Sequence, residues 1–380
     1  MKYFPLLFAN LRRRKWRTIL TIASVALALF LFASLRTVVT TIGAYAQFGS
    51  ARRLVTTNAT GIVFVLPLAY ANRLRAVPGV EAVSWANWIG ARYGDGKRFF
   101  ANFAVDPESY LDMYPEMVLP PEQREAFLRE RSSAIVGVRL LDVFGWRLGQ
   151  DVTLQGTIFP GDWTFTIRGI YTPSDPLIND DMLLFHHDYL DERIGRPGIA
   201  GWYVLRIKDP NAAPAIAKTI DDMFKNSSSP TKTGTEQAFN ASFATMWGNV
   251  GLLMNTIGVA VVFAILLVTA NAMMMSARER TSEIAVLKTI GFSDRTLFGL
   301  VMVEAGLITL TGALIGLGSA KWLYRATNFN AAGFLPGFDV SVGTLVTGFG
   351  IALLLMLASG LVPAMQAARL PVIQALRRVV

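Results

Sequence analysis

The chain has 380 residues, of which 52% are hydrophobic and 17% charged, and its formal net charge is +9. This composition is too apolar for an ordinary soluble protein and is typical of membrane proteins. Residues 41–246 carry 20 basic and 22 acidic side chains, so the positive excess lies beside the apolar stretches. A nucleic-acid-binding protein would concentrate that excess on a soluble face, and we expect no nucleic-acid partner. The absence of cysteine excludes disulfides, thiolate metal sites and a cysteine nucleophile.

Four long apolar stretches, of which only the third contains a charged residue (Glu304), predict four transmembrane helices, because a bilayer core needs about 20 helical residues. One precedes a long polar segment and three follow it, over residues 18–35, 237–277, about 296–317 and about 342–362. A cleaved signal peptide is the alternative for the first stretch, but its apolar core would be shorter and no convincing cleavage site follows. We therefore expect an α-helical membrane protein with a mixed α/β domain between spans one and two.

The basic residues beside the spans predict the orientation. They gather before the first span, between spans two and three, and after the fourth, at Arg12, Arg13, Arg14, Lys15, Arg278, Arg280, Lys288, Arg295, Arg369, Arg377 and Arg378. Short basic segments stay in the cytoplasm, so both termini are expected there and the polar domain on the other side. A short outer loop with Asn328, Asn330, Gly333 and Pro336 joins spans three and four.

The second stretch is longer than a membrane requires. Its 41 uncharged residues would form a helix of about 60 Å, twice the thickness of the hydrocarbon core. We expect a helix that projects from the membrane as a stalk, and residues 37–51 could extend the first span similarly. The alternative is an ordinary span preceded by a polar loop.

The polar segment predicts several elements of an α/β domain. A helix is expected over 68–77, ending at Pro78 and Gly79, and an amphipathic helix over 213–224. Strands are expected over 152–158, 163–167 and 202–207, the first two forming a hairpin around a turn at 160–162. Residues 226–234 predict a flexible connector. The charged segment 106–131 could form a separate subdomain.

Candidate catalytic residues are scarce in this domain. His186 and His187 lie near several aspartates, and a solvated surface loop is preferred over a metal site because adjacent histidines on a strand point to opposite faces. The sequence contains no GxSxG, HExxH or GxxxxGK[ST] motif. We expect no catalytic residue, metal ligand or cofactor on this chain.

Two features lie inside the third span. Gly312 and Gly316 form a GxxxG pair, which permits close approach of helices. Glu304 is an acid within the span, and intramembrane carboxylates are candidate functional groups. Because Glu304 lies near the inner end of the span, pairing with a basic group there is the preferred interpretation.

The loop between spans two and three predicts a short amphipathic helix. Apolar residues recur at Ile284, Leu287 and Ile290, and a charged start precedes them. Gly291 ends the helix, and Ser293 or Asp294 can cap the next one. Such a helix could lie on the lipid surface or pack on its own neighbours.

This loop resembles the signature loop of the MacB/FtsX-type ABC transporter permeases, in which a span ends in an ERTxEIxxLKxIG run. The matching residues are Glu279, Arg280, Thr281, Glu283, Ile284, Leu287, Lys288, Ile290 and Gly291. An amphipathic helix over 2–11 and the ending from Pro363 to Arg377 also match the family. The resemblance covers nearly the whole chain, and the inner loop is its most specific part.

The resemblance implies a coupling helix that docks on a separate ABC ATPase subunit. Glu279, Arg280, Glu283, Leu287 and Gly291 would form or support that contact. ATP and Mg would be bound by the partner, with two ATPase copies beside a permease homodimer or a pair of close paralogues. A periplasmic adaptor and an outer-membrane channel are further expected partners, with the lipid bilayer of the bacterial inner membrane as the environment.

The expected organisation has three parts: residues 1–44 with the N-terminal helix and span one, residues 45–246 as a periplasmic MacB-like domain with its stalk, and residues 247–380 with spans two to four and the coupling loop 276–296. Full MacB pumps carry the ATPase domain on the same chain, whereas the sequence of this chain has no Walker motif. We therefore expect this chain to need a separate ATPase partner. We expect a permease subunit that converts ATP hydrolysis by that partner into export or extraction. The alternative is an FtsX-like module that activates a cell-envelope hydrolase without transport. A membrane-anchored enzyme is disfavoured because no nucleophile–base set is visible.

Overall fold

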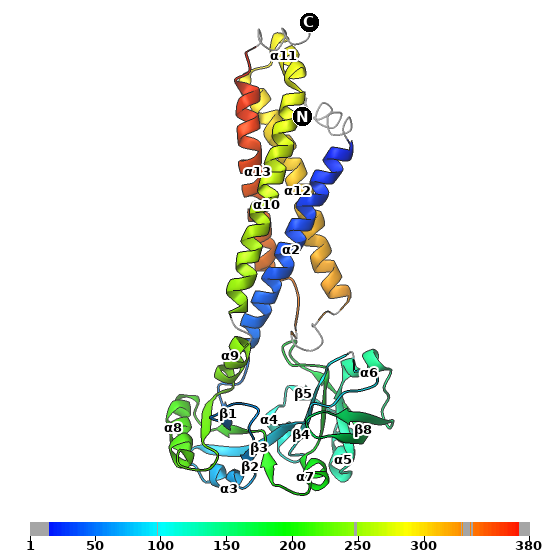
Figure 1. The fold of residues 1–380 in the computed structure, drawn as a ribbon, viewed down its shortest axis with the longest axis vertical. Coiled ribbons are helices and arrows are strands. Elements are labelled where there is room, and N and C mark those ends of the chain that lie inside the picture. Colours follow the sequence, from blue (N-terminus) through cyan, green and yellow to red (C-terminus); the bar gives the residue numbers. More distant parts are fainter. Residues whose placement is uncertain are drawn as a thin grey trace. The chain divides into compact units, whose positions relative to one another are not determined.

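The computed structural model describes residues 15–371 except 97, 247–248, 328, 330–334 and 336. The helix expected over 2–11, the basic run Arg12–Arg14, Arg377 and Arg378, and most of the outer loop therefore lie outside the described residues. The chain divides into two compact units, a membrane unit (1–40, 249–329 and 338–380) and an outer unit (41–248 and 330–337). Figure 1 shows the helices and strands of both.

The described residues include four helices that are long and apolar enough to cross a membrane, as predicted. They are α2 (Lys15–Gln47), α10 (Val250–Glu279), α12 (Asp294–Ala326) and α13 (Val342–Ala368). At 27 to 33 residues they are about 40 to 50 Å long, against about 30 Å for the hydrocarbon core. The first, third and fourth predicted spans were shorter, because they followed only the apolar core of each stretch, whereas the helices continue through flanking polar turns.

The helices of the membrane unit pack through small residues. A Cβ atom on Gly348 of α13 would come within 2.7 Å of Leu317 on α12, and one on Gly360 within 2.9 Å of the Cβ of Ala305. Glycine at these positions allows α12 and α13 to approach closely, as in many membrane helix pairs. The buried core of this unit also includes Val25 and Leu29 of α2.

The long uncharged stretch is not the single continuous helix that the sequence predicted. It contains α9 (Glu236–Met246) in the outer unit and α10, which starts at Val250 in the membrane unit. The side chain of Asn249 caps α10 by accepting a hydrogen bond from the Leu252 N–H at 3.0 Å. The backbone of an N-cap residue is not helical, so α9 and α10 are two separate helices. By contrast, α2 is a single helix from Lys15 to Gln47.

The outer unit contains one large mixed sheet, which in the described chain has ten strands in the order β12-β1-β11-β3-β4-β9-β6-β8-β5, with β7 paired to β8. Most pairs are antiparallel, but β4–β9 and β6–β8 are parallel. The strands of this sheet are β1 (Arg53–Asn58), β3 (Val80–Trp88), β4 (Ala101–Val105), β5 (Met117–Val118), β6 (Ser133–Gly137), β7 (Asp151–Gly156), β8 (Gly161–Pro173), β9 (Met182–His186), β11 (Trp202–Ile207) and β12 (Thr231–Thr235), and β2 (Leu66–Pro67) pairs separately with β10 (Ile199–Ala200).

Helices cover this sheet over three apolar cores, one of which contains Phe127. One core lies under α3 and α8 and includes Leu54, Tyr203 and Phe224, and another is centred on Trp163 and Phe165. The helices are α3 (Tyr70–Arg75), α4 (Tyr110–Met113), α5 (Pro121–Arg129), α6 (Val138–Phe144), α7 (His187–Arg193) and α8 (Ala213–Phe224), with a 3₁₀ turn over Pro210–Ala212. The helices predicted around 68–77 and over 213–224 and the strand over 202–207 are confirmed. Alternating burial also confirms the predicted strand at Trp163 to Ile167.

Three details of the predicted outer domain were wrong. The hairpin turn lies before Gly161, because β8 starts there and Gly161 pairs with Gly156. The expected flexible connector contains β12, which pairs with β1. Asp221 holds this edge strand by accepting a hydrogen bond from the Thr233 N–H at 3.0 Å. The segment 106–131 is no separate subdomain, since Phe127 is fully buried in a core shared with β6, β8 and β9.

The two histidines are buried, not in a solvated loop as expected. His186 ends β9 and His187 starts α7, and their exposed fractions are 3% and 2%. His186 Nε2 lies 2.7 Å from the carbonyl oxygen of Phe127, and His187 Nε2 lies 2.8 Å from that of Ile199. The sequence could not place them inside because the aspartates around them indicated a polar surface. Each imidazole joins two segments of the outer unit.

Acidification should destabilise the outer unit through His186. Burial lowers the pKa of His186 below its ordinary value of about 6.5, although the Phe127 carbonyl and Asp188 act in the opposite direction, and Arg131 reinforces the lowering. The unfolded chain therefore binds more protons than the folded one just below pH 6.5, and stability falls as the pH drops through that range. The contribution is at most about 1.4 kcal/mol per pH unit.

The measurement is the pH dependence of unfolding of the outer unit in the full chain. His186→Gln should reduce the slope of the unfolding free energy between pH 6.5 and 5, because glutamine can donate to the Phe127 carbonyl but does not titrate. An unchanged slope would show that other groups cause the pH dependence.

Candidate functional site

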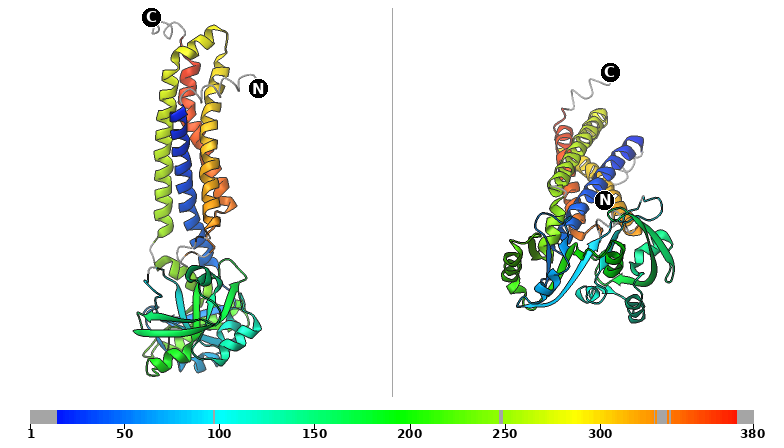
Figure 2. Two further views of the ribbon diagram at one scale, coloured as in Figure 1. Left: turned by 90° about the vertical axis from the view of Figure 1, so that its right-hand side faces the viewer. Right: turned by 60° about the horizontal axis from the view of Figure 1, so that its bottom comes forward.

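The candidate site is the corner at which α10 meets α11 (Thr281–Thr289), the short helix predicted in the inner loop. Figure 2 shows α11 between α10 and α12 at one end of the membrane unit. Arg280 is both the C-cap of α10 and the N-cap of α11. Glu283 lies in the first turn of α11, where a carboxylate is favoured by the helix dipole.

The end of α11 is a Schellman motif. Gly291 has a φ of +100°, and its N–H donates to the carbonyl of Lys288 at 3.0 Å. The Phe292 N–H donates to the carbonyl of Leu287 at 3.1 Å, and these two side chains pack in one apolar cluster. Ser293 then caps α12 by accepting from the Thr296 N–H. The predicted stop at Gly291 and the cap at Ser293 are confirmed.

Two apolar residues of α11 face the chain's own helices. Ile284 is 7% exposed and Leu287 is half-buried, and both pack with Leu297 of α12 and Ala367 of α13. These contacts fix α11 on the ends of α12 and α13. Leu287 therefore supports the helix from within and does not present its side chain outward.

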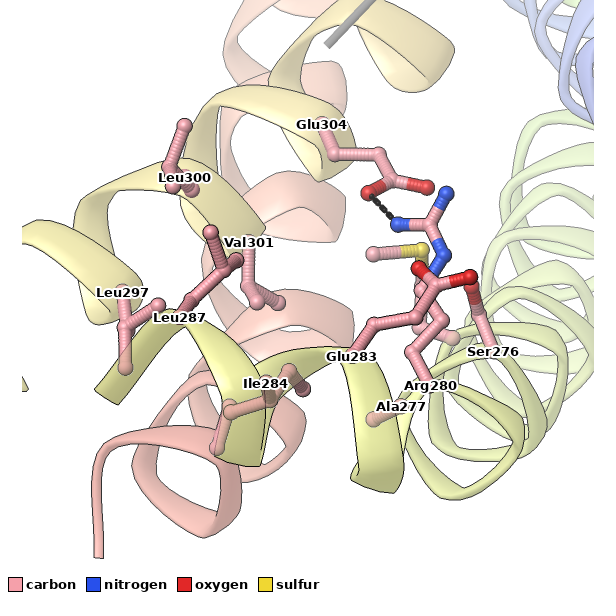
Figure 3. A pocket seen from close by; sticks show the side chains of 12 residues that line it. Ser276, Ala277, Arg280, Glu283, Ile284, Leu287, Leu297, Leu300, Val301 and Glu304 are labelled. Atoms are coloured by element: carbon pink, nitrogen blue, oxygen red, sulfur yellow. Dashed lines mark hydrogen bonds and ion pairs between the residues drawn. The ribbon is translucent and has the colours of Figure 1, made fainter. Parts of the chain in front are cut away.

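Charged residues of the signature run bind neighbouring helices. Arg280 Nη1 donates to Glu304 Oε2 of α12 at 2.6 Å, with side-chain exposures of 17% and 9% (Figure 3). The preferred interpretation of Glu304, pairing with a basic group at the inner end of the span, agrees with this geometry. Glu279 Oε2 lies 2.5 Å from Arg17 Nη1 of α2. Two consecutive residues thus connect the corner to two different helices.

Lys288 connects α11 to a third helix. Its Nζ donates to the carbonyls of Ala368 and Leu370 at 2.6 and 3.1 Å, at the end of α13, and lies 2.8 Å from Asp294. Carbonyls at a helix C-terminus lack intrahelical partners and carry partial negative charge, so they favour a cation. Lys288 and the apolar contacts together hold α11 against the ends of α12 and α13.

The outward face of α11 carries Ser282, Val286 and Ile290, spaced at i, i+4 and i+8. Val286 is 47% exposed and Ile290 is 70% exposed. The periodicity had grouped Ile290 with Ile284 and Leu287, but the structure separates it from them. The i, i+4 spacing of Val286 and Ile290 was the available signal for this second, exposed apolar stripe.

A small cavity lies beneath the corner. Its volume is about 60 Å³, and its lining includes Arg280, Glu283 and Glu304 among apolar side chains of α11 and α12 (Figure 3). Sites for small-molecule ligands have volumes of about 300–1,000 Å³, so this cavity can hold waters but no substrate of that size.

The predicted GxxxG pair lies against α2. A Cβ atom on Gly312 would come within 2.7 Å of Val25 Cγ1, and one on Gly316 within 2.2 Å of the carbonyl oxygen of Ala26. The Tyr324 hydroxyl also donates to Ser34 Oγ at 2.6 Å. This pair of glycines therefore brings α2 and α12 together within one chain.

Two family models match the chain. Residues 255–372 match the FtsX-like permease C-terminal model, and residues 18–223 match the MacB-like periplasmic core domain. The chain belongs to the MacB/FtsX-type family of ABC transporter permeases. This permease is thus a membrane protein with an extracytoplasmic domain, which lies between its first and second spans.

Individual relatives are distant. The permease is 24% identical over 287 residues to the macrolide export ATP-binding/permease protein MacB of Agrobacterium fabrum, covering 73% of this chain and 38% of that protein. It is 22% identical over 329 residues to an uncharacterized ABC transporter permease of Methanocaldococcus jannaschii, covering 80% and 77%. The permease spans 30 to 46% of the length of the first three relatives compared.

Solved structures of outer domains are also similar. The periplasmic region of MacB from Actinobacillus actinomycetemcomitans has a TM-score of 0.36 at 12% identity, covering 52% of this chain and 93% of that one. The extracellular domain of the ABC-type transporter YknZ from Gram-positive bacteria has a TM-score of 0.35 at 11% identity, covering 48% and 98%.

Proposed function

We propose that this chain is the permease subunit of an ABC transporter that converts ATP hydrolysis by a separate ATPase subunit into movement of its outer domain. That movement drives export or extraction of a substrate. The observation that carries the proposal is the geometry of the corner between α10 and α11. Residues that face inward fix α11 on three helices, while Val286 and Ile290 remain exposed. A rigid helix with an exposed apolar stripe suits docking in a groove of a partner.

In this proposal, the residues of the signature run have different roles. Glu279, Arg280 and Leu287 hold α11 in place through α2, α12 and α13, and Gly291 shapes its end. Glu283 sits on the exposed surface of the first turn, where its charge can set the register of the partner. Val286 and Ile290 enter the ATPase groove, because burial of apolar surface is the dominant favourable contribution in most protein–protein association.

The remaining assembly follows the family resemblance. Two copies of the permease, or this chain and a close paralogue, pair with two ATPase subunits that bind ATP and Mg. Residues 45–246 lie outside the cytoplasmic membrane of a bacterium and both termini lie in the cytoplasm, in agreement with the basic residues at the ends of the spans. An adaptor and an outer-membrane channel complete the path where a second membrane is present.

The MacB-like model over residues 18–223 and the MacB relatives support export over the FtsX-like signalling alternative. The same docking step belongs to both functions, so co-purification of an envelope hydrolase in place of an adaptor would favour signalling.

The first test is capture of the ATPase by tagged permease in nanodiscs. Ile290→Asp should reduce the captured ATPase at least tenfold, because a buried unpaired carboxylate costs more than the 1.4 kcal/mol that corresponds to a factor of ten. Val286→Asp should act similarly. Ile290→Val is the matched control, since it keeps an apolar side chain at the same place.

Full capture by both aspartate variants would show that this stripe does not face the ATPase. Loss of the permease itself from the membrane would show a structural effect, so the amount and thermal stability of each variant are measured beside the capture. If the unsubstituted permease captures no ATPase, the proposed function is wrong.

A further inference from the structure

The inner end of α2 makes few apolar contacts in the described chain. Trp16, Ile19 and Leu20 have exposed fractions of 71%, 52% and 64%. Apolar packing begins near Ile22 and Val25, which contact α12 and its neighbours. The part of α2 between residue 15 and Ile22 is therefore held in position mainly by polar contacts.

Arg17 supplies such contacts. Its Nη1 donates to Glu279 Oε2 at 2.5 Å, and its Nη2 donates to Ser276 Oγ at 3.0 Å. Ser276 is 6% exposed, so the guanidinium reaches into the last turn of α10. A planar guanidinium that binds two partners holds a fixed direction. Glu279, the last residue of α10, directly precedes Arg280, which is the N-cap of the coupling helix α11.

The helices α2 and α10 differ in how each connects to the outer unit. The chain enters the outer unit within α2, which remains helical from Lys15 to Gln47, past the boundary at Thr41. It returns from the outer unit through α9, and α10 begins anew at the Asn249 cap. A continuous helix transmits an axial displacement along its hydrogen-bonded length, whereas the Asn249 cap interrupts this path on the α10 side.

We propose that Arg17 is a positioning residue that makes α2 move with the coupling helix, so that α2 carries the motion of the ATPase to the outer domain. This inference rests on the proposed function and adds the route by which the motion leaves the corner. The Arg280–Glu304 pair holds α12 at the same corner. The contacts of Arg17 add α2 to the helices that move together with α11.

Spin labels can test this route because the chain has no cysteine. Ala238→Cys places a single label on an exposed position of α9. In the full permease–ATPase complex in nanodiscs, the distance distribution between the labels of two copies is measured without nucleotide and with ADP–vanadate. Nucleotide should shift the distribution in the otherwise unsubstituted complex. Arg17→Gln should reduce the shift at least threefold while the ATPase still co-purifies.

Two further variants separate positioning from charge and folding. Lys15→Gln removes a positive charge from an exposed position in the same turn and should retain the full shift. The reversed pair Arg17→Glu with Glu279→Arg should recover most of the shift, which a merely damaged fold would not do. A full shift in Arg17→Gln, or no recovery in the reversed pair, would overturn the role of Arg17. Absence of the ATPase from the unsubstituted preparation would instead overturn the proposed function.

Discussion

Gly316→Leu is expected to prevent α2 from packing on α12 and to remove most of the folded permease from the membrane. Any Cβ atom at this position would lie 2.2 Å from the Ala26 carbonyl oxygen and 3.0 Å from its Cα, so the clash is with backbone and no rotamer can relieve it. Overpacking a side chain typically costs about 1–3 kcal/mol, and separating two helices also removes the contacts of Val25 and Leu29. We expect a loss of at least about 3 kcal/mol.

Gly318→Leu is the matched control, because it lies on the same helix and a Cβ atom there meets nothing within 4 Å. Membrane abundance and the thermal stability of the detergent-solubilised protein report the difference. Equal values for the two leucine variants would show that α2 does not approach α12 at Gly316. Gly316→Ala should fall between them, since it adds the Cβ atom alone.

Arg53→Met is expected to destabilise the outer unit by about 3–5 kcal/mol, the range for breaking a buried ion pair. The Arg53 side chain is 4% exposed, and its Nε donates to Glu236 Oε2 at 2.7 Å. Its Nη1 donates to Glu116 at 2.9 Å and to the Met113 carbonyl at 2.9 Å. Methionine would fill the space of the stem but leave the Glu236 carboxylate buried without its cation.

This network joins the two places where the chain enters and leaves the outer unit. Glu236 starts α9 and also accepts a hydrogen bond from the Ser50 N–H at 2.8 Å, just before β1. A Cβ atom on the neighbouring Gly49 would lie 2.9 Å from the same carboxylate oxygen. Loss of Arg53 should therefore loosen both connections, which hydrogen exchange of the peptides around residues 48–58 and 231–240 in the full chain would detect.

Arg52→Met provides the control for this prediction. Arg52 is adjacent in sequence but 49% exposed, and it pairs with Glu81 at 3.2 Å on the surface. Exposed ion pairs contribute about 0–1 kcal/mol, so this variant should unfold close to the unsubstituted protein. Equal destabilisation by both substitutions would show that burial of Arg53 is not the cause.

Much of this architecture was predictable because its signals are local in sequence. An apolar run that lies in lipid must be helical, since lipid cannot satisfy backbone polar groups, and four long apolar runs therefore placed the four spans. Alternation from Trp163 to Ile167 and helical spacing from Ala213 to Phe224 report which side of each element is buried. Gly291 also stops α11 by its sequence alone, because the left-handed conformation there favours glycine.

Other features depended on residues that meet only in the folded chain. The spacing of Ile284, Leu287 and Ile290 predicted one apolar face, but α12 and α13 cover only the first two. His186 and His187 looked exposed among aspartates, yet the carbonyls that accept their hydrogen bonds belong to residues 127 and 199. Such long-range pairings have no local pattern in the sequence.

The sequence by itself determined the membrane class, the four spans, the separate outer domain and the family, because hydrophobic length, charge and a short signature run express each of them. The tertiary structure decided which face of α11 is exposed, that Arg17 meets Glu279 across 262 positions of chain, and that α2 is the continuous helix into the outer unit. These depend on side chains from distant segments competing for the same buried space, and that competition is resolved only when the helices pack.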